Sequence, residues 1–174
     1  MAASRRLLVA VSLLSLGSAL AFALGADPAP RAPLLFPLPI DHLSGLRDSF
    51  KDKRGGRIHE AVDIMAPRDT PVLAVADGRV AKLFLSVPGG KTIYQFDTAE
   101  SVAYYYAHLD RYAEGLAEGA EVKRGDVIGF VGNTGNASNG APHLHFAIFK
   151  LGPERQWWKG EPIDPYPLLT GTPR

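Results

Sequence analysis

The sequence contains no cysteine among its 174 residues. This absence excludes disulfides, thiolate metal ligands, cysteine nucleophiles and lipid-modified cysteines. The formal net charge is only +1, and no run of Lys or Arg forms a basic patch, so nothing indicates a nucleic-acid partner. Because the chain has no cysteine, any metal site must be built from histidine and carboxylate side chains, a donor set that suits zinc.

The remaining composition is that of one globular domain. Hydrophobic residues make up 46% of the chain and charged residues 21%. The length is sufficient for a single domain with a substantial core. No internal repeat, heptad pattern or low-complexity tract is present.

The amino terminus has the pattern of an export signal. Arg5 and Arg6 precede an uncharged stretch, residues 7–24, that ends in small residues spaced as Ala-x-Ala. We expect residues 1–25 to be a signal peptide. At roughly 18 apolar residues the stretch could instead remain as an N-terminal inner-membrane anchor, the only membrane contact expected. Either way, the domain is expected to be exported, to the periplasm or the exterior.

A proline-rich segment follows the signal. Prolines prevent it from forming a helix or a central strand, so residues 26–45 are predicted to be an extended lead-in. The working domain is predicted to occupy residues 46–170. The prolines are Pro28, Pro30, Pro33, Pro37 and Pro39.

Alternating apolar residues and glycine-containing turns predict a mainly β fold after the lead-in. We expect a single antiparallel sheet or barrel-like domain with long loops and little helix. A strand over residues 71–76 is expected to pair with one over residues 79–85 through a hairpin turn at Asp77-Gly78. A brief helical turn is expected only over residues 111–116.

The charged segment over residues 47–57 precedes the first candidate site residue. It contains the turn signal Gly55-Gly56 among several Lys, Arg and Asp residues. Such a composition is typical of a solvated surface loop, which is our prediction for it.

A strand with two histidines is the clearest single motif. Because side chains alternate between the faces of a strand, His143 and His145 are expected to lie on one face. Leu144, Phe146 and Ile148 then lie on the other, apolar face. Two imidazoles on one face of a rigid strand can hold a metal ion or transfer a proton.

A second motif has the pattern His-x-x-x-Asp. In an extended chain, His59, Ala61 and Asp63 share a face, so the histidine and the carboxylate could bind one ion. Asp63 lies between the apolar residues Val62 and Ile64, where burial of an unpaired carboxylate would be costly. A coordinated cation would remove that cost.

A third strand ends near His108. Alternation groups His108 with Tyr104 and Tyr106 on one face, whereas Tyr105 is assigned to cross-strand packing. Four of the five histidines of the chain lie in these three motifs. The remaining one, His42, is interpreted as structural or solvated.

Together, the three motifs resemble the lysostaphin-type (LytM-like) zinc endopeptidases. The resemblance covers roughly residues 46–150 and is specific because the motifs occur in the same order and at similar spacing. The matching stretches are His59-x-x-x-Asp63, Asp63-Ile64-Met65-Ala66-Pro67, Thr70-Pro71-Val72-Leu73-Ala74, Asp77-Gly78-Arg79-Val80, Tyr106-Ala107-His108-Leu109, Gly125-Asp126-Val127-Ile128-Gly129, Gly132-Asn133-Thr134-Gly135-Asn136 and His143-Leu144-His145.

Members of that family cleave peptide bonds in bacterial cell-wall peptidoglycan. The resemblance implies that His59, Asp63 and His145 bind Zn²⁺, and that His108 and His143 flank the zinc-bound water that attacks the scissile carbonyl. It also implies stem or cross-link peptides of peptidoglycan as substrates, and we expect a monomer. Either His108 or His143 could be the general base.

Two departures from the family pattern and one alternative function remain. Ala61 and Asp69 stand where glycine is usual, although neither change removes a ligand. Relatives of the same fold include non-catalytic regulators or wall-binding modules that activate other hydrolases. These usually lack one or more of the five site residues, all of which are present here.

Trp157-Trp158 is expected either to line a groove or to pack on the sheet as a C-terminal lid.

Overall fold

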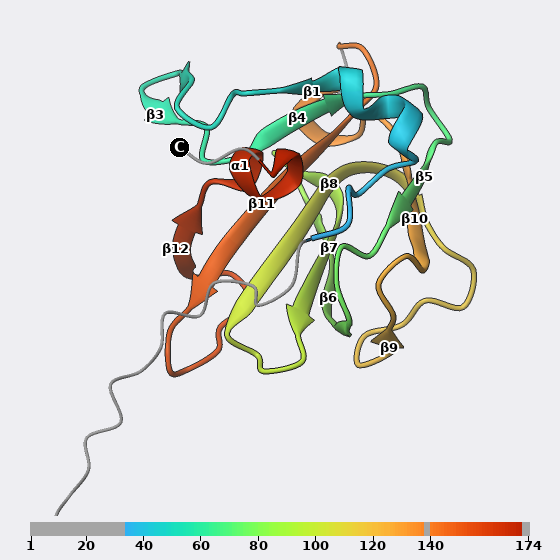
Figure 1. Ribbon diagram of the computed structural model, residues 1–174, viewed down its shortest axis with the longest axis vertical. Helices are drawn as coiled ribbons and strands as arrows, with labels where there is room; N and C mark the ends of the chain where they lie inside the picture. Colours follow the sequence, from blue (N-terminus) through green and yellow to red (C-terminus); the bar gives the residue numbers. More distant parts are fainter. Residues whose placement is uncertain (1–33, 138–139, 172–174) are drawn as a thin grey trace, which may run out of the picture.

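The computed structural model describes residues 34–137 and 140–171, and its regular secondary structure is mostly β-strand (Figure 1). The strands are β1 Leu46–Arg47, β2 Lys53–Arg54, β3 Arg57–Ile58, β4 Val62–Met65, β5 Pro71–Leu73, β6 Gly78–Ser86, β7 Gly90–Asp97, β8 Val102–Tyr112, β9 Glu121–Val122, β10 Val127–Val131, β11 His143–Leu151 and β12 Gly160–Ile163. The helical segments are the 3-10 turns η1 Ile40–Gly45 and η2 Gly135–Ala137 and the helix α1 Pro165–Thr170. The predicted mainly β fold with little helix is confirmed.

The strands of the larger sheet pair antiparallel, and β11 is one of its interior strands. The order is β1-β4-β11-β8-β7-β6-β9, with β12 also pairing with β11 and β10 pairing with both β5 and β8. Strand β11 therefore has β4 on one side and β8 on the other. These three neighbouring strands are the ones that carry the histidine motifs.

The two faces of β11 differ as the alternation predicts. Leu144, Phe146 and Ile148 are fully buried in the hydrophobic core, and His143 and His145 remain partly exposed on the opposite face. Strand β11 thus separates the core from the face that carries the histidines.

A buried tyrosine links the core to the loop before β6. The Tyr106 hydroxyl donates a hydrogen bond to Gln95 Oε1 at 2.7 Å and accepts one from the Val75 amide at 3.1 Å. All three groups are buried. The hydroxyl therefore satisfies a donor and an acceptor that have no access to water.

Replacing Tyr106 with phenylalanine is expected to lower the free energy of unfolding by about 1–3 kcal/mol, because two buried polar groups lose their partner. Tyr104→Phe is the matched control, since that ring is equally buried but its hydroxyl makes no hydrogen bond to another described residue. The control should change stability much less. If urea denaturation gave equal losses of unfolding free energy for the two variants, the stabilising role of the Tyr106 hydroxyl would be contradicted.

The hairpin predicted at Asp77-Gly78 is wrong. Strand β5 pairs with β10, and β6 pairs with β7 and β9. The chain leaves β5 along a different path because the Ala74 amide donates to the Asp126 carbonyl at 2.9 Å, and the Ala74 carbonyl accepts from the Gly125 amide at 2.9 Å. A turn signal does not identify the partner of a strand when a distant strand competes for it.

The helical turn predicted over residues 111–116 is also wrong at its start. Arg111 and Tyr112 continue β8, where they pair with Phe130 and Gly129 of β10. The pairing with β10 keeps Arg111 and Tyr112 in an extended conformation instead of a helical turn.

Part of the predicted lead-in packs against the sheet. Leu34, Phe36 and Leu38 are buried in the core, and the Leu35 amide donates to the Val75 carbonyl at 2.9 Å. The predicted signal or anchor and the first part of the lead-in lie outside the described residues. Within the described residues, no helix has the length and apolarity needed to span a bilayer.

Candidate metal centre

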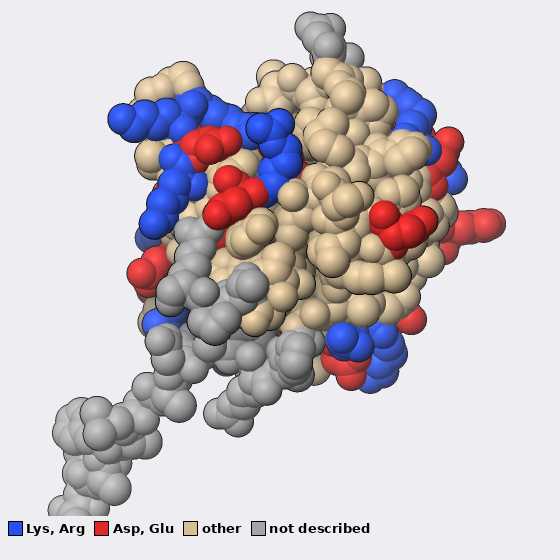
Figure 2. Space-filling view, turned by 45° about the horizontal axis from the view of Figure 1, so that its top comes forward, with Lys and Arg blue, Asp and Glu red and all other residues tan. Residues whose placement is uncertain are grey.

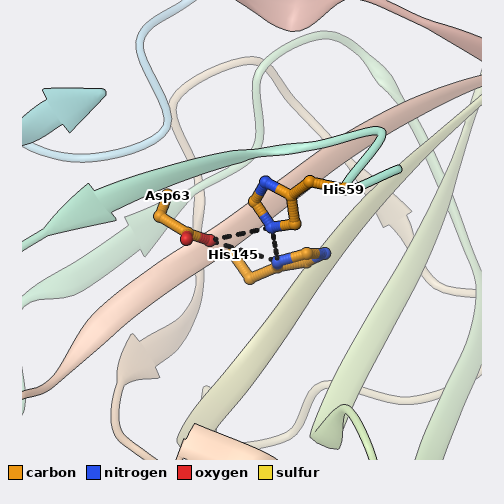
Figure 3. A group of neighbouring side chains, drawn as sticks. All are labelled: His59, Asp63 and His145. Carbon is orange, nitrogen blue, oxygen red and sulfur yellow. Dashed lines mark hydrogen bonds and ion pairs between the residues drawn. The ribbon is translucent and has the colours of Figure 1, made fainter. Parts of the chain in front are cut away.

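Three side chains converge on one point: His59 from the β3–β4 connection, Asp63 from β4 and His145 from β11 (Figure 3). His59 Nε2 lies 3.1 Å from His145 Nδ1 and 3.4 Å from Asp63 Oδ1. His145 Nδ1 lies 3.2 Å from the same Asp63 oxygen. Two imidazole nitrogens and one carboxylate oxygen can therefore contact a single ion.

Strand register explains one half of this convergence. His145 of β11 is the direct cross-strand partner of Asp63 of β4, so their side chains project from the same face. Ala107 of β8 is the partner of His145 on its other side, and its small side chain leaves that face open.

His59 joins the group by a route that the sequence analysis did not predict. The chain is not continuously extended from His59 to Asp63, because Glu60 has a positive φ of 56°. The amides of His59 and Glu60 donate to the carbonyls of Asp52 and Phe50, both at 2.9 Å, which stabilises this bend. The predicted convergence is present, but a turn produces it.

Hydrogen bonding orients the His59 ring. Its Nδ1 donates to the Ser49 carbonyl at 3.0 Å, so Nε2 carries the lone pair that faces the group. A metal-binding histidine typically has such a partner for its second nitrogen, which fixes both tautomer and orientation.

The charges of the three side chains match a divalent cation. Burial by itself would raise the pKa of Asp63, but its polar contacts with His145, His59 and Arg54 outweigh burial and hold that pKa well below its usual range. Burial lowers the pKa of His145. The centre thus offers one ionised carboxylate and neutral imidazole, the donor set that zinc prefers.

The other two predicted histidines lie beside this group. The His108 ring centroid is 5.0 Å from that of His143 and 5.5 Å from that of His145. His143 Nε2 lies 3.9 Å from Asp63 Oδ1. The structure therefore brings together all five predicted site residues, whereas His42 lies in η1 and is not part of the group.

The two flanking rings have the same orientation relative to their backbone partners. His108 Nδ1 donates to the Thr134 carbonyl at 2.9 Å, and His143 Nδ1 donates to the Ala141 carbonyl at 2.9 Å. In the neutral form of each ring, this hydrogen bond leaves Nε2 as the nitrogen that can accept a proton. Burial, together with the nearby His145 and His143, lowers the pKa of His108 to about 4, so its ring is neutral at physiological pH.

The face predicted for His108 is wrong. Tyr106 pairs with Ile93 and Leu109 pairs with Lys91, so β8 has one more residue than β7 between these pairs. His108 lies in this bulge with a positive φ of 61°, and its amide donates to the Gly89 carbonyl at 2.9 Å. The bulge turns His108 toward the centre while Tyr106 stays in the core.

Tyr105 is a site residue that the sequence analysis missed. It lines a cavity of about 260 Å³ at the centre, together with Arg54, Arg57, Glu60, His108 and His145. Its ring centroid is 5.9 Å from that of His145 and 4.7 Å from that of Tyr94. Burial raises its pKa, so the phenol remains protonated. The alternation of the strand could have indicated it, since it places Tyr105 opposite the core tyrosines.

The segment predicted as a solvated loop is a small hairpin beside the centre. Strands β2 and β3 pair across Gly55-Gly56, and Arg54 reaches Asp63 Oδ2 at 2.7 Å. This ion pair occupies the carboxylate oxygen that does not face the histidines. No short motif marks Arg54, because its contact depends on the path of the hairpin.

The aromatic pair after β11 has two roles. Trp157 packs on the sheet, as expected for a C-terminal lid. Its ring centroid lies 5.2 Å from that of Phe84 and 4.8 Å from that of Tyr94. Trp158 is 62% exposed. Only Trp157 therefore closes over the sheet.

The antiparallel sheet and the His–Asp–His group with two flanking histidines define a zinc metallopeptidase domain. The chain belongs to peptidase family M23, whose profile matches residues 57–165. This family is the lysostaphin-type group that the sequence motifs resemble, and the zinc site His59/Asp63/His145 is typical of it.

Curated relatives and a solved structure agree with this membership. The chain is 36% identical to the L-Ala–D-Glu endopeptidase of Bacillus subtilis over 142 residues, and 36% identical to the DD-carboxypeptidase/endopeptidase Mpg of Neisseria meningitidis over 118 residues. These matches cover 77% and 67% of this chain, but only 42% and 24% of the relatives. The catalytic domain of lysostaphin from Staphylococcus simulans superposes with a TM-score of 0.62 at 27% identity, covering 76% of this chain and 98% of that one.

Proposed function

We propose that this chain is an exported zinc-dependent endopeptidase that hydrolyses peptide bonds in bacterial peptidoglycan. The observation that carries the proposal is the convergence of five polar side chains on one face of the sheet, three within ion-binding distance and two beside them. The activities of the Bacillus and Neisseria relatives, an L-Ala–D-Glu endopeptidase and a DD-carboxypeptidase/endopeptidase, support this class of substrate. We also propose that residues 46–170 form the peptidase domain. The protein is proposed to act as a monomer.

The side chains divide into a metal-binding set and a proton-transfer set. His59, Asp63 and His145 would hold the ion, and Arg54 keeps the carboxylate oriented and ionised. Zinc, when bound, acts as a Lewis acid that acidifies water and polarises the peptide carbonyl.

Proton transfer is assigned to the two flanking histidines. Because Nδ1 of His108 and of His143 donates to a backbone carbonyl, Nε2 of each ring is available to accept the proton of the attacking water. The imidazolium that results can then donate a proton to the leaving amine. The phenol of Tyr105 is a further donor on the same face, suited to an oxygen on which negative charge develops.

The experiment that tests this function uses the full chain and purified peptidoglycan. With one zinc per chain, we expect soluble muropeptides to be released. After removal of the metal with a chelator the release should stop, and it should return when zinc is added back. Circular dichroism of the metal-free protein checks that the fold is retained.

The competing function is a regulator or wall-binding module that does not cleave peptides. Unchanged muropeptides in the presence of zinc-loaded protein would overturn the proposed activity. Stimulation of a separate wall hydrolase by the same preparation would then indicate the regulatory function.

A further inference from the structure

We propose that Arg57, next to Arg54, binds a carboxylate of the substrate peptide close to the scissile bond. The chain would then select peptides that carry a free carboxylate at this position. This inference rests on the proposed function, since it assigns the substrate class of the same site.

The β2–β3 hairpin places both arginines at the metal centre. Arg54 and Arg57 are direct cross-strand partners, so their side chains leave the hairpin on the same side. Both line the cavity of about 260 Å³ that also contacts His59, His108 and His145. A group bound by Arg57 therefore shares one cavity with the groups that hold the metal and transfer protons.

The charges around this cavity leave one guanidinium uncommitted. Arg54 is paired with Asp63 at 2.7 Å. Within the described part of the chain, no ion pair joins Arg57 to an acidic residue, including Glu60, the other charged residue that lines the cavity. Arg57 can thus offer its donors to a ligand. On the space-filling surface, Lys and Arg side chains gather around this hairpin, with acidic side chains among them (Figure 2).

The cross-strand pairing of Arg54 with Arg57 carries an electrostatic cost. Like charges directly opposite each other on neighbouring strands destabilise the pair. Asp63 compensates Arg54, but no described side chain compensates Arg57. An anionic substrate group would offset the remaining repulsion when it binds.

A carboxylate is the anion that fits both the residue and the substrate. The guanidinium group is planar and matches the two oxygens of a carboxylate through paired hydrogen bonds. In a peptide substrate that group could be the carboxylate of an acidic residue beside the scissile bond or the carboxylate at the C-terminus. Both have the same chemistry, so the experiment must separate them.

The test uses four synthetic stem peptides in which the internal carboxylate and the C-terminal carboxylate are each free or amidated. With zinc-loaded full chain, we expect kcat/KM to fall by about 10- to 100-fold when the recognised carboxylate is amidated, the effect of losing a charge-assisted hydrogen-bond pair. Amidation of the other carboxylate should have little effect, which identifies the source.

Variants of the hairpin separate recognition from folding. We define the preference as the kcat/KM for the free peptide divided by that for the amidated peptide. Arg57→Gln should lower this ratio toward one. Arg57→Lys keeps the charge but not the paired donors of the guanidinium group, so it should retain part of the preference. Lys53→Gln is the matched control in the same hairpin, because Lys53 does not line the cavity. Thermal unfolding should be similar for all of these proteins.

The outcomes distinguish this inference from the proposed function. If wild-type protein cleaves none of the four peptides and does not act on peptidoglycan, the proposed function fails. If it cleaves them without a preference, or if Arg57→Gln slows free and amidated peptides equally, the carboxylate site is overturned while the peptidase activity stands.

Discussion

Replacing Asp63 with asparagine is expected to lower the hydrolysis rate by roughly 10³-fold or more, because Lewis-acid stabilisation by zinc is worth several kcal/mol. The substitution removes the only anionic donor of the group. It also leaves the Arg54 guanidinium without its carboxylate partner at 2.7 Å. We therefore expect zinc affinity and activity to fall together, measured by metal content after dialysis and by muropeptide release.

The matched control for this variant is Asp69→Asn. Asp69 is more than half exposed and pairs with Arg111 away from the metal group, so the same chemical change should leave zinc binding and rate close to wild type. An Asp63→Asn protein that retained one zinc per chain and full activity would show that the carboxylate is not a ligand.

Replacing His108 or His143 with glutamine is expected to lower kcat by about 10²- to 10⁴-fold, the contribution typical of a positioned general acid or base. Zinc content should remain near one per chain, since neither ring belongs to the group of three donors that lie together. Glutamine keeps a polar group of similar reach but cannot accept a proton at physiological pH. Single-turnover rates at saturating peptide would separate the chemical step from binding.

His42→Gln is the control for both histidine variants, because His42 lies in η1 outside the centre. The variant with the larger loss of the acidic limb in its pH–rate profile identifies the base, because a general base is inactive when it is protonated at low pH. Loss of zinc in either variant would instead assign that histidine to the metal-binding set. Wild-type activity in both would remove the proton-transfer role.

The strand patterns predict the site best where the backbone remains regular. In β11 the alternation correctly separates His143 and His145 from the buried Leu144, Phe146 and Ile148. Burial of an otherwise costly carboxylate also correctly marks Asp63. Both inferences depend only on local side-chain periodicity, which a short sequence segment contains.

The prediction fails where the backbone departs from that periodicity. The positive φ at His108 and the bulge beside it move this side chain to the other face, and the turn at Glu60 replaces the extended path assumed for His59. Tyr105 packs on its cross-strand partner Tyr94 as predicted, but its second position, in the lining of the cavity, was not predicted. The pairing of β5 with β10 and the contact of Arg54 with Asp63 depend on tertiary placement, which no local pattern encodes.

The two-sided character of β11 also restricts how this region can vary. Because neighbouring side chains point to opposite faces, a one-residue slip against β4 would bury both imidazoles and expose three large apolar groups. A single-residue insertion or deletion within this strand would therefore disrupt the hydrophobic interior and the reactive surface at once. Length changes should be tolerated only in the connections beyond its ends.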